Sequence, residues 1–406
     1  MSLDPYALRR QYPAFQRSID GRPAVYMDGP GGTQMPESVI EAMDGTLRRG
    51  ISNLGGGFAS SRDAARITAT ARSAGADLFG ADDDQSIIFG QNMTSLTFAM
   101  SRALAREWRP GDRIVTTSLD HDANITPWRL AATERGATVD VWEFDVDTTR
   151  LELSDLEALL TDRTKLVSVT HASNAFGTMS NIPAVVAAAH AVGAMVYVDA
   201  VHYAPHGLID VAASGADFLV ASAYKFFGPH TGMLYGKRSH LERLSAYKVR
   251  PAPGEGAGKW ETGTQSFESL AAVTAVVDYI ASIGSGETRR ERIVAALASI
   301  SRHEEWAGAR FLAGLATMSH IRLYGLPTME GRAPTFAIDV AGRHPGEVAE
   351  ELGRRGVFVW SGDYYALEAM ERLGLNDHGG LVRIGFVHTT TAEEVDRVLE
   401  DLSSLR

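Results

Sequence analysis

Seven short apolar segments alternate with helix-like stretches between residues 86 and 236, and this alternation constrains the fold more than any other feature. The segments are rich in β-branched and aromatic residues and lack polar alternation, which is typical of strands buried on both faces. Strand–helix–strand repetition predicts an α/β fold with a mostly parallel seven-stranded sheet. Ligands of such sheets bind at the carboxyl ends of the strands. The predicted strands are SIIFG (86–90), DRIVTTS (112–118), TVDVWEFD (138–145), KLVSVTH (165–171), AMVYVDA (194–200), DFLVAS (217–222) and GMLYG (232–236).

The sequence pattern changes after Glu268, where long helical patterns cover residues 270–284 and 289–318. Strands and helical segments then alternate in a small C-terminal α+β domain. The predicted strands there are IRLYG (321–325), TFAIDV (335–340), VFVWSG (357–362) and LVRIGFV (381–387), with helical segments at 344–356 and 391–405. We therefore expect a large domain over residues 21–290 and a small domain over 291–406, with residues 1–20 packed on the small domain.

Charge and hydropathy exclude several classes of protein. The chain of 406 residues carries 39 Lys and Arg against 50 Asp and Glu, a net charge of −11, so we expect no nucleic-acid partner. No run of 18 apolar residues is present, so we expect no membrane partner. The opening MSLDPYALRRQYPAF lacks the layout of a secretion signal, and we expect a cytoplasmic protein.

The chain contains no cysteine, which excludes disulfides, thiolate metal ligands and a cysteine nucleophile within these residues. We expect no metal. Lysine is also rare: only Lys165, Lys225, Lys237, Lys248 and Lys259 stand among 39 basic residues. Unlike arginine, a lysine can lose its proton and attack a carbonyl group, so each lysine is a candidate for chemistry.

Three strand ends carry candidate functional groups. Asp199 closes a buried strand, where a carboxylate needs a cation or acts as a helix cap. Lys225 follows the strand that ends at residue 222 and is either functional or a surface residue. The turn FGQNMTS (89–95) leads into a helix whose first N–H groups form an anion site, or simply a capped helix start.

Together these groups match the needs of pyridoxal 5'-phosphate (PLP). The lysine amine bonds to the aldehyde of PLP, and the carboxylate keeps its pyridine nitrogen protonated. The helix start receives the phosphate. His121 follows strand 112–118 and is placed to stack on the ring. Asn174 follows strand 165–171 and is placed to donate to the phenolic oxygen.

The motifs HDANITPW, SNAFGT, YVDAVH, SAYKFFGP and TGTQ occur in an order that resembles the class V aminotransferase family of fold type I PLP enzymes. The resemblance runs through nearly the whole chain. That family includes cysteine desulfurases, cysteine sulfinate desulfinases, kynureninases and isopenicillin N epimerase. The implied fold is the PLP-dependent transferase fold type I, and the implied assembly is a homodimer whose active site is shared between subunits.

The resemblance also assigns roles to single residues. It implies that Lys225 carries the cofactor, that Asp199 pairs with the pyridinium and that His121 stacks on the ring. Arg383 matches the arginine that binds the substrate α-carboxylate, in keeping with its fork of donors. The cofactor-binding residues are completed by Asn92, Met93, Asn174, His202, Ser222 and Tyr224, with Gly263 and Thr264 supplied by the other subunit.

Several departures from the family pattern bear on the reaction. Desulfurases of this family carry a cysteine on a loop that matches FVWSGDYYALEAM, and its place falls near Tyr365. Without a thiol the chain cannot carry a persulfide, so it is not a cysteine desulfurase. His202 stands where many relatives have glutamine, and Tyr224 replaces a frequent histidine. The opening YMDGPGGTQMP is rich in glycine, so Gly31 and Gly32 either enlarge the substrate site or form a tight turn.

We therefore expect a PLP-dependent lyase that cleaves the C–S bond of an S-substituted cysteine or related amino acid by Cα deprotonation and β-elimination. Tyr365 joins Arg383, Gly31 and Gly32 as expected substrate contacts. The alternatives are decarboxylation with oxidative deamination or C–C bond formation, an aminotransferase, an epimerase, and a binding protein without turnover. The cysteine-free pattern resembles PLP enzymes of lincosamide-antibiotic pathways, which implies a role in natural-product biosynthesis.

Overall fold

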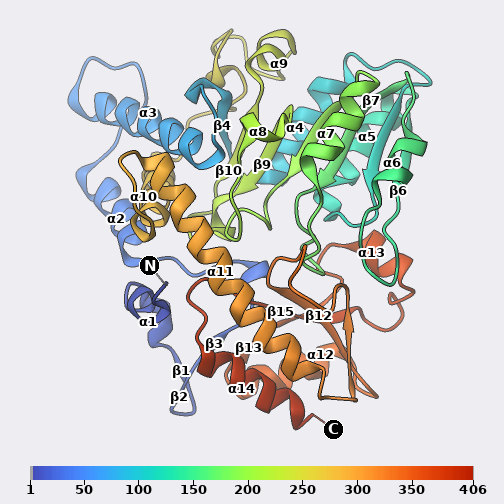
Figure 1. The fold of residues 1–406 in the computed structure, drawn as a ribbon. Helices are drawn as coiled ribbons and strands as arrows, with labels where there is room; N and C mark the ends of the chain where they lie inside the picture. The colour runs from blue at the N-terminus through green and yellow to red at the C-terminus, as the bar shows by residue number, and fades with distance from the viewer. Residues whose placement is uncertain (1–2, 406) are drawn as a thin grey trace.

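A seven-stranded sheet forms the centre of the computed structural model, which describes residues 3–405 (Figure 1). The strand order is β4-β10-β9-β8-β7-β5-β6. Strand β10 runs antiparallel to both of its neighbours, and the other pairs are parallel. The predicted α/β class with a mostly parallel seven-stranded sheet is confirmed. The strands are β4 (Ile87–Gly90), β5 (Arg113–Thr117), β6 (Thr138–Trp142), β7 (Thr164–Thr170), β8 (Met195–Asp199), β9 (Phe218–Ser222) and β10 (Gly232–Gly236).

Helices cover both faces of this sheet, because successive strand residues point to opposite sides. Leu219 and Ala221 of β9 pack into one core with α3, α7 and α10, whereas Phe218 and Val220 pack into a second core with α4 and α5. Two buried faces explain why the strands read as continuous apolar runs. The helices around the sheet are α2 (Glu37–Arg49), α3 (Ala59–Phe79), α4 (Met93–Ala105), α5 (Thr126–Arg135), α6 (Leu153–Leu159), α7 (Ile182–Ala191), α8 (Val211–Ser214), α9 (Arg238–Arg243) and α10 (Phe267–Ile283).

The C-terminal module contains a four-stranded antiparallel sheet in the order β11-β12-β15-β14. The segment VFVWSG, expected as one strand, divides into β13 and β14. Strand β13 leaves this sheet and pairs in parallel with β3 (Val25–Tyr26) near the N-terminus. The elements are β11 (Ile321–Tyr324), β12 (Thr335–Val340), α12 (Pro345–Arg354), β13 (Val357–Phe358), β14 (Trp360–Gly362), α13 (Leu367–Arg372), β15 (Leu381–Gly385) and α14 (Ala392–Ser403).

The N-terminal residues lie beside the C-terminal module. In α1 (Pro5–Arg9), Arg9 donates to Glu394 of α14 at 2.8 Å, and Tyr6 donates to Glu393 at 2.6 Å. A short hairpin of β1 (Ser18–Ile19) and β2 (Arg22–Pro23) follows. Helix α11 (Arg289–Leu315) runs from α10 down to the small sheet, so it touches both modules (Figure 1). The domain boundaries at residues 20 and 290 stay predictions.

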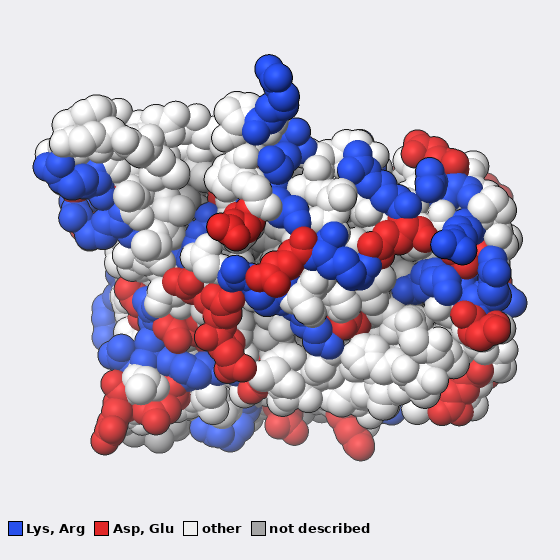
Figure 2. All heavy atoms as spheres, turned by 90° about the horizontal axis from the view of Figure 1, so that it is seen from above, with Lys and Arg blue, Asp and Glu red and all other residues white. Residues whose placement is uncertain are grey.

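The surface carries both signs of charge. On the face drawn in Figure 2, basic and acidic side chains are interspersed and neither sign covers the face alone. Within residues 3–405, no helix combines the length and apolar character that a membrane crossing needs. The expectations of a cytoplasmic location and of no nucleic-acid partner stay predictions.

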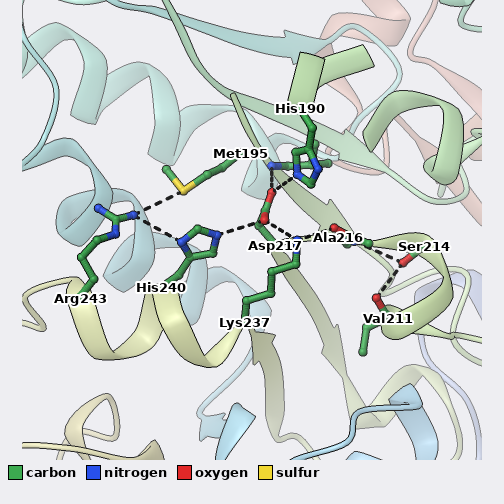
Figure 3. A network of polar contacts seen from close by, with 11 residues as sticks. His190, Met195, Val211, Ser214, Ala216, Asp217, Lys237, His240 and Arg243 are labelled. Carbon is green, nitrogen blue, oxygen red and sulfur yellow. Dashed lines mark hydrogen bonds and ion pairs between the residues drawn. The ribbon is translucent and has the colours of Figure 1, made fainter. Parts of the chain in front are cut away.

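A buried carboxylate ties the amino-terminal edge of the sheet together (Figure 3). Asp217, just before β9, accepts from Lys237 at 2.7 Å, His240 at 3.1 Å and His190 at 2.8 Å, and from the Val196 backbone at 2.8 Å. Burial raises the pKa of Asp217, but these hydrogen bonds outweigh burial and hold the pKa below its usual 3.8. The carboxylate therefore joins α7, β8, β9 and α9.

Asp217→Asn should lower the free energy of unfolding by about 2–4 kcal/mol at neutral pH, because it leaves the half-buried Lys237 ammonium and the Val196 N–H without the anion that they share. The folded-state pKa is depressed, so this stability is present above about pH 4 and is lost as the pH falls below that value. Urea unfolding at several pH values measures it. Asp162→Asn, on an exposed loop, is the matched control, and equal loss in the two variants would contradict the role of Asp217.

Candidate active site

A cavity of about 720 Å³ opens at the carboxyl ends of the strands, between the large sheet and the C-terminal module. Residues from both modules line it, including Lys225 from the end of β9 and Arg383 from β15. Twelve of the residues predicted from the sequence meet here. They are Gly31, Asn92, Met93, His121, Asn174, Asp199, His202, Ser222, Tyr224, Lys225, Tyr365 and Arg383.

Lys225 presents a buried amine to this cavity. Its Nζ donates to the carbonyl oxygen of Pro30. Burial and the nearby Arg383 cation lower the pKa of Lys225 from 10.5 to about 7, although Asp199 and Asp28 oppose the change. At neutral pH about half of these amines are therefore unprotonated and nucleophilic.

Asp199 lies opposite as a buried anion at the end of β8. It is 4% exposed, and one carboxylate oxygen accepts from the Val201 backbone at 2.8 Å. Burial raises the pKa of Asp199 from 3.8 to about 6, although Val201 and Lys225 lower it. A buried carboxylate with one neutral donor gains most from a cationic partner, and a pyridinium N–H supplies one.

The start of helix α4 forms a third side of the cavity. Asn92 caps the helix: its side chain accepts from the Ser95 backbone at 2.9 Å, and Ser95 bonds back to the Asn92 backbone. The Met93 N–H donates to Ser222 Oγ at 2.9 Å. Thr94 on the first turn of α4 and the Ser222 hydroxyl line the cavity, so the Thr94 N–H and the hydroxyl are donors suited to a phosphate.

His121, after β5, sits as an uncharged ring at the cavity wall. Its Nδ1 accepts from the Ala123 backbone at 3.0 Å, and its ring stacks on Tyr365 with centroids 5.4 Å apart. Burial and the cations Lys225 and Arg383 lower the pKa of His121 from 6.5 to about 4. At neutral pH the ring is flat and uncharged, so it can stack on a cofactor ring without adding a positive charge.

Three further predicted residues, Asn174, Tyr224 and His202, line the cavity. Asn174 donates from Nδ2 to the Tyr364 carbonyl at 2.9 Å, and its Oδ1 is buried without a partner. Tyr224 stacks on His230 at 4.8 Å. His202 lies at the back of the cavity, with Nε2 3.0 Å from the Thr335 hydroxyl.

Arg383 points its guanidinium into the cavity from the middle of the small sheet. Nη1 donates to the Asn174 carbonyl at 2.9 Å, the group lies 4.3 Å above the Tyr364 ring, and Nε is buried without a partner. Burial lowers the pKa of Arg383 from 12.5 to about 10. The group keeps its charge at neutral pH and has donors free for a carboxylate.

A loop after β14 closes the cavity with Tyr364 and Tyr365. Both residues have left-handed backbone, with φ of 56° and 57°, which costs free energy in a side chain of this size. Bonds from the large module hold it: Asn174 donates to the Tyr364 carbonyl, and the Asp122 N–H donates to the Tyr365 carbonyl at 2.7 Å. Tyr365 is 70% exposed at the mouth.

Gly32, Gly263 and Thr264 do not line this cavity. Gly32 faces the Tyr224 ring, which lies 3.4 Å from where a Cβ would stand, and borders a separate small cavity. Gly263 and Thr264 are exposed on the surface, and Thr264 accepts from Asn53 at 3.2 Å. Their assignment to a partner's site stays a prediction.

Trp360 and Asp28 belong to the site but were not singled out from the sequence. The Trp360 indole lines the cavity mouth, and a Cβ on Gly31 would lie 2.3 Å from its Nε1. The glycine therefore makes room for this indole. Asp28 follows β3 and acts electrostatically on both Lys225 and Arg383. The pairing of β3 with β13, the bridge between Asp28 and Gly385 and the hydrogen bond from the Thr33 N–H to the Tyr224 carbonyl bring these segments together, and no local pattern signals them.

Comparison with known proteins places the chain in a family. Residues 25–398 match the family described as Aminotransferase class-V, so the chain belongs to that family. Class V aminotransferases and cysteine desulfurases depend on PLP, which confirms the predicted cofactor.

Particular relatives are similar over nearly the whole chain. A probable cysteine desulfurase of Mycolicibacterium paratuberculosis is 33% identical over 97% of this chain, which spans only 57% of that relative's length. The aminotransferase-like protein FGM3 of Gibberella zeae is 31% identical over 97% of this chain and 96% of its own. The apo structure of a cysteine desulfurase from Thermococcus onnurineus superposes with a TM-score of 0.90 at 27% identity, covering 100% of this chain and 98% of that one.

The residues present fit PLP. Lys225 offers a partly unprotonated amine, and Asp199 offers a buried carboxylate that lacks a cation among residues hydrogen-bonded to it. The first turn of α4 with Thr94, together with the Ser222 hydroxyl, offers donors for a phosphate, and His121 offers a neutral stacking face. These groups are the ones that would hold the cofactor.

The rate at which cofactor-free protein takes up PLP should rise with pH through a midpoint near 7, because only the unprotonated Lys225 amine attacks an aldehyde. Arg383→Met should raise that midpoint by about one pH unit, since it removes a cation that lowers the pKa of Lys225. Stopped-flow absorbance over a pH series measures both. A midpoint near that of free lysine would contradict the assignment.

Asp199→Asn should stabilise the cofactor-free protein while weakening PLP binding. The folded protein holds the Asp199 proton up to about pH 6, so its free energy of unfolding falls as the pH rises from about 4 to about 6 and stays lower above that. The variant lacks this penalty and should gain about 1–3 kcal/mol near pH 8 and nothing near pH 4. Thermal unfolding with and without PLP measures both effects, and a variant less stable at high pH would contradict the interpretation.

Proposed function

We propose that this chain is a PLP-dependent lyase that cleaves the C–S bond of an S-substituted cysteine by β-elimination. The observation that carries the proposal is the composition of the cavity. Lys225 and Arg383 converge on it, while Tyr365 occupies the loop that matches the cysteine loop of desulfurases. The site can therefore bind and deprotonate an amino acid, but this chain has no thiol to receive sulfur.

Arg383 binds the α-carboxylate of the substrate. Its unpaired Nε and its remaining Nη donors suit the two oxygens of a carboxylate. The group stays charged at neutral pH and is held by the Asn174 carbonyl and the Tyr364 ring. A fixed carboxylate fixes the adjacent Cα, which leaves the β-substituent as the part of the substrate free to point toward the mouth.

Lys225 moves the Cα proton. Bound PLP supplies an electron sink that stabilises negative charge at the substrate Cα. In the cofactor-free protein the pKa of Lys225 is about 7, and its amine lies in the same cavity as the carboxylate-binding arginine, so Lys225 would be a base matched to neutral pH once it is released from the cofactor. Asp199 supports the sink by holding a proton on the pyridine nitrogen.

The sulfur then leaves with its bonding electrons. The Cα–H and Cβ–S bonds break, a proton joins the sulfur to give a thiol, and water hydrolyses the three-carbon product to pyruvate and ammonium. No oxidant and no further reductant are needed. A desulfurase instead delivers sulfur to its own cysteine, and Tyr365 offers only a phenol there.

The mouth of the cavity favours a large substituent on sulfur. Trp360 and Tyr365, 53% and 70% exposed, present aromatic surface at the opening. The missing side chain of Gly31 lets the indole lie against the wall. Flat apolar groups stack on such rings, so S-aryl or S-benzyl cysteine should be a better substrate than free cysteine.

Incubation of the holoprotein with S-benzylcysteine should release benzyl thiol and pyruvate in equal amounts, as measured by mass analysis of the products. Lys225→Ala should form neither product. Lys165→Ala changes a lysine at the start of β7, at the opposite end of that strand from the cavity, and should behave as wild type. Carbon dioxide with a sulfur-containing aldehyde would replace the proposal with decarboxylation. Dependence on a keto acid, or inversion at Cα, would replace it with transamination or epimerisation.

We further propose a homodimer whose second subunit supplies Gly263 and Thr264 to this cavity, since both residues are exposed away from the cavity of their own chain. A cytoplasmic location and a role in natural-product biosynthesis complete the proposal. The small-molecule substrate is an amino acid in every version of this reaction.

A further inference from the structure

One histidine at the cavity wall has no task in the stacking of the cofactor ring or in the movement of the Cα proton. Within residues 3–405, the lining residues with a basic side chain are His121, His202, Lys225, His230 and Arg383. His121 offers a stacking face, Lys225 an amine and Arg383 a guanidinium for a carboxylate, while His202 lies at the back. His230 is left, and it is exposed on the turn that leads into β10.

The pairing of β9 with β10 fixes the place of His230. Ser222 pairs with Gly232, and a backbone hydrogen bond of 2.8 Å continues the ladder by one residue beyond this pair. The next pair in the same register is Tyr224 and His230. Their rings stack with centroids 4.8 Å apart and planes 10° apart. The hairpin therefore presents the two rings as one stacked pair.

The neighbouring pair of the ladder contacts the start of α4. Ser222 Oγ accepts from the Met93 N–H at 2.9 Å, and a Cβ on Gly232 would lie 2.5 Å from the carbonyl carbon of Asn92. Both stacked rings line the same cavity as Ser222 and Thr94. The imidazole of His230 therefore belongs to the end of the cavity where the donors for a phosphate gather.

The Tyr224 ring is a fixed platform for this imidazole. Its carbonyl accepts from the N–H and from the hydroxyl of Thr33, each at 3.0 Å. Lys225 Nζ lies 4.9 Å from the centroid of the same ring. One tyrosine ring thus has the amine for the aldehyde and the His230 imidazole close to it.

This arrangement suits the chemistry of PLP. The aldehyde and the arm that carries the phosphate are attached to adjacent carbons of the pyridine ring, so a group for the phosphate must lie near Lys225. A phosphate monoester carries about −1.5 to −2 charges at neutral pH. The donors from Thr94 and Ser222 are neutral, whereas an imidazole can donate as a cation.

We propose that His230 binds the phosphate of PLP and that Tyr224 is the positioning residue that holds the His230 ring in place. The imidazole adds a donor able to carry charge to the neutral donors at the start of α4. This role depends on the cofactor and not on which bond of the substrate is cleaved, so it stands or falls apart from C–S cleavage.

Pyridoxal, which lacks the phosphate, separates this role from a general change in the cavity. His230→Ala should weaken the binding of PLP to the cofactor-free protein by about tenfold or more and that of pyridoxal by less than about twofold, because it removes a charge-assisted hydrogen bond to the phosphate alone. Titrations followed by the visible absorption of the bound cofactor measure both. His378→Ala, which changes an exposed histidine after α13, is the matched control and should alter neither.

Phosphorus nuclear magnetic resonance of the holoprotein gives a second measurement, which a loss of stability alone does not change. The resonance of the bound phosphate should shift in His230→Ala and stay in place in His378→Ala. Unchanged PLP affinity in folded His230→Ala, or equal weakening of PLP and pyridoxal, would overturn the proposal.

Tyr224→Ala tests the positioning role. It should weaken PLP binding about as much as His230→Ala does, and the double variant should be little weaker than either single variant. Tyr224→Phe keeps a ring on which His230 can stack and should restore most of the lost affinity. A loss in Tyr224→Phe as large as that in Tyr224→Ala would assign the contact to the tyrosine hydroxyl and overturn the role given to the stacked ring.

Discussion

Burial of the Lys225 amine at the carboxyl end of the sheet is the constraint on which the site depends. A lysine withdrawn from water beside Arg383 loses its proton near pH 7, and Asp199 keeps the cluster from carrying an excess of positive charge. The strands fix these groups, since each follows or ends a buried strand whose two faces are covered by helices. The apolar cores thus contribute to reactivity, because the low polarity around Lys225 lowers its pKa and leaves part of the amine unprotonated at neutral pH.

The two modules share the site, and segments far apart in the sequence connect them. Strand β13 pairs with β3, and the segment after β3 also bridges to Gly385 of β15. These contacts place Pro30 where its carbonyl accepts from Lys225, and Gly31 beside Trp360. Helix α11 spans the same junction from the other side. Cofactor chemistry belongs to the large module, whereas carboxylate recognition by Arg383 and the aromatic mouth belong to the small one.

Much of this arrangement could be predicted from the sequence. The seven strands around Asp199 and Lys225 are readable because strands buried on both faces give continuous apolar runs. The cavity gathers most of the residues that the family resemblance implied. The division of VFVWSG, the placement of Trp360 and the reason for Gly31 were not readable. Each depends on a contact between segments more than 300 residues apart, and periodicity carries no record of such a partner. The electrostatic role of Asp28 could not be predicted for the same reason, since it acts on residues that are distant in the sequence.

The backbone of Tyr364 and Tyr365 has one more consequence. Two successive large residues in left-handed conformation need partners: Asp363 accepts from the Tyr365 N–H within the loop, and Asn174 and Asp122 bond to the two tyrosine carbonyls across the module boundary. The loop therefore has a strained backbone, and two of the hydrogen bonds that restrain it come from the large module. Substitutions that weaken these hydrogen bonds would let the loop relax, widen the entrance and broaden the range of accepted substrates, without any change to Lys225 or Asp199.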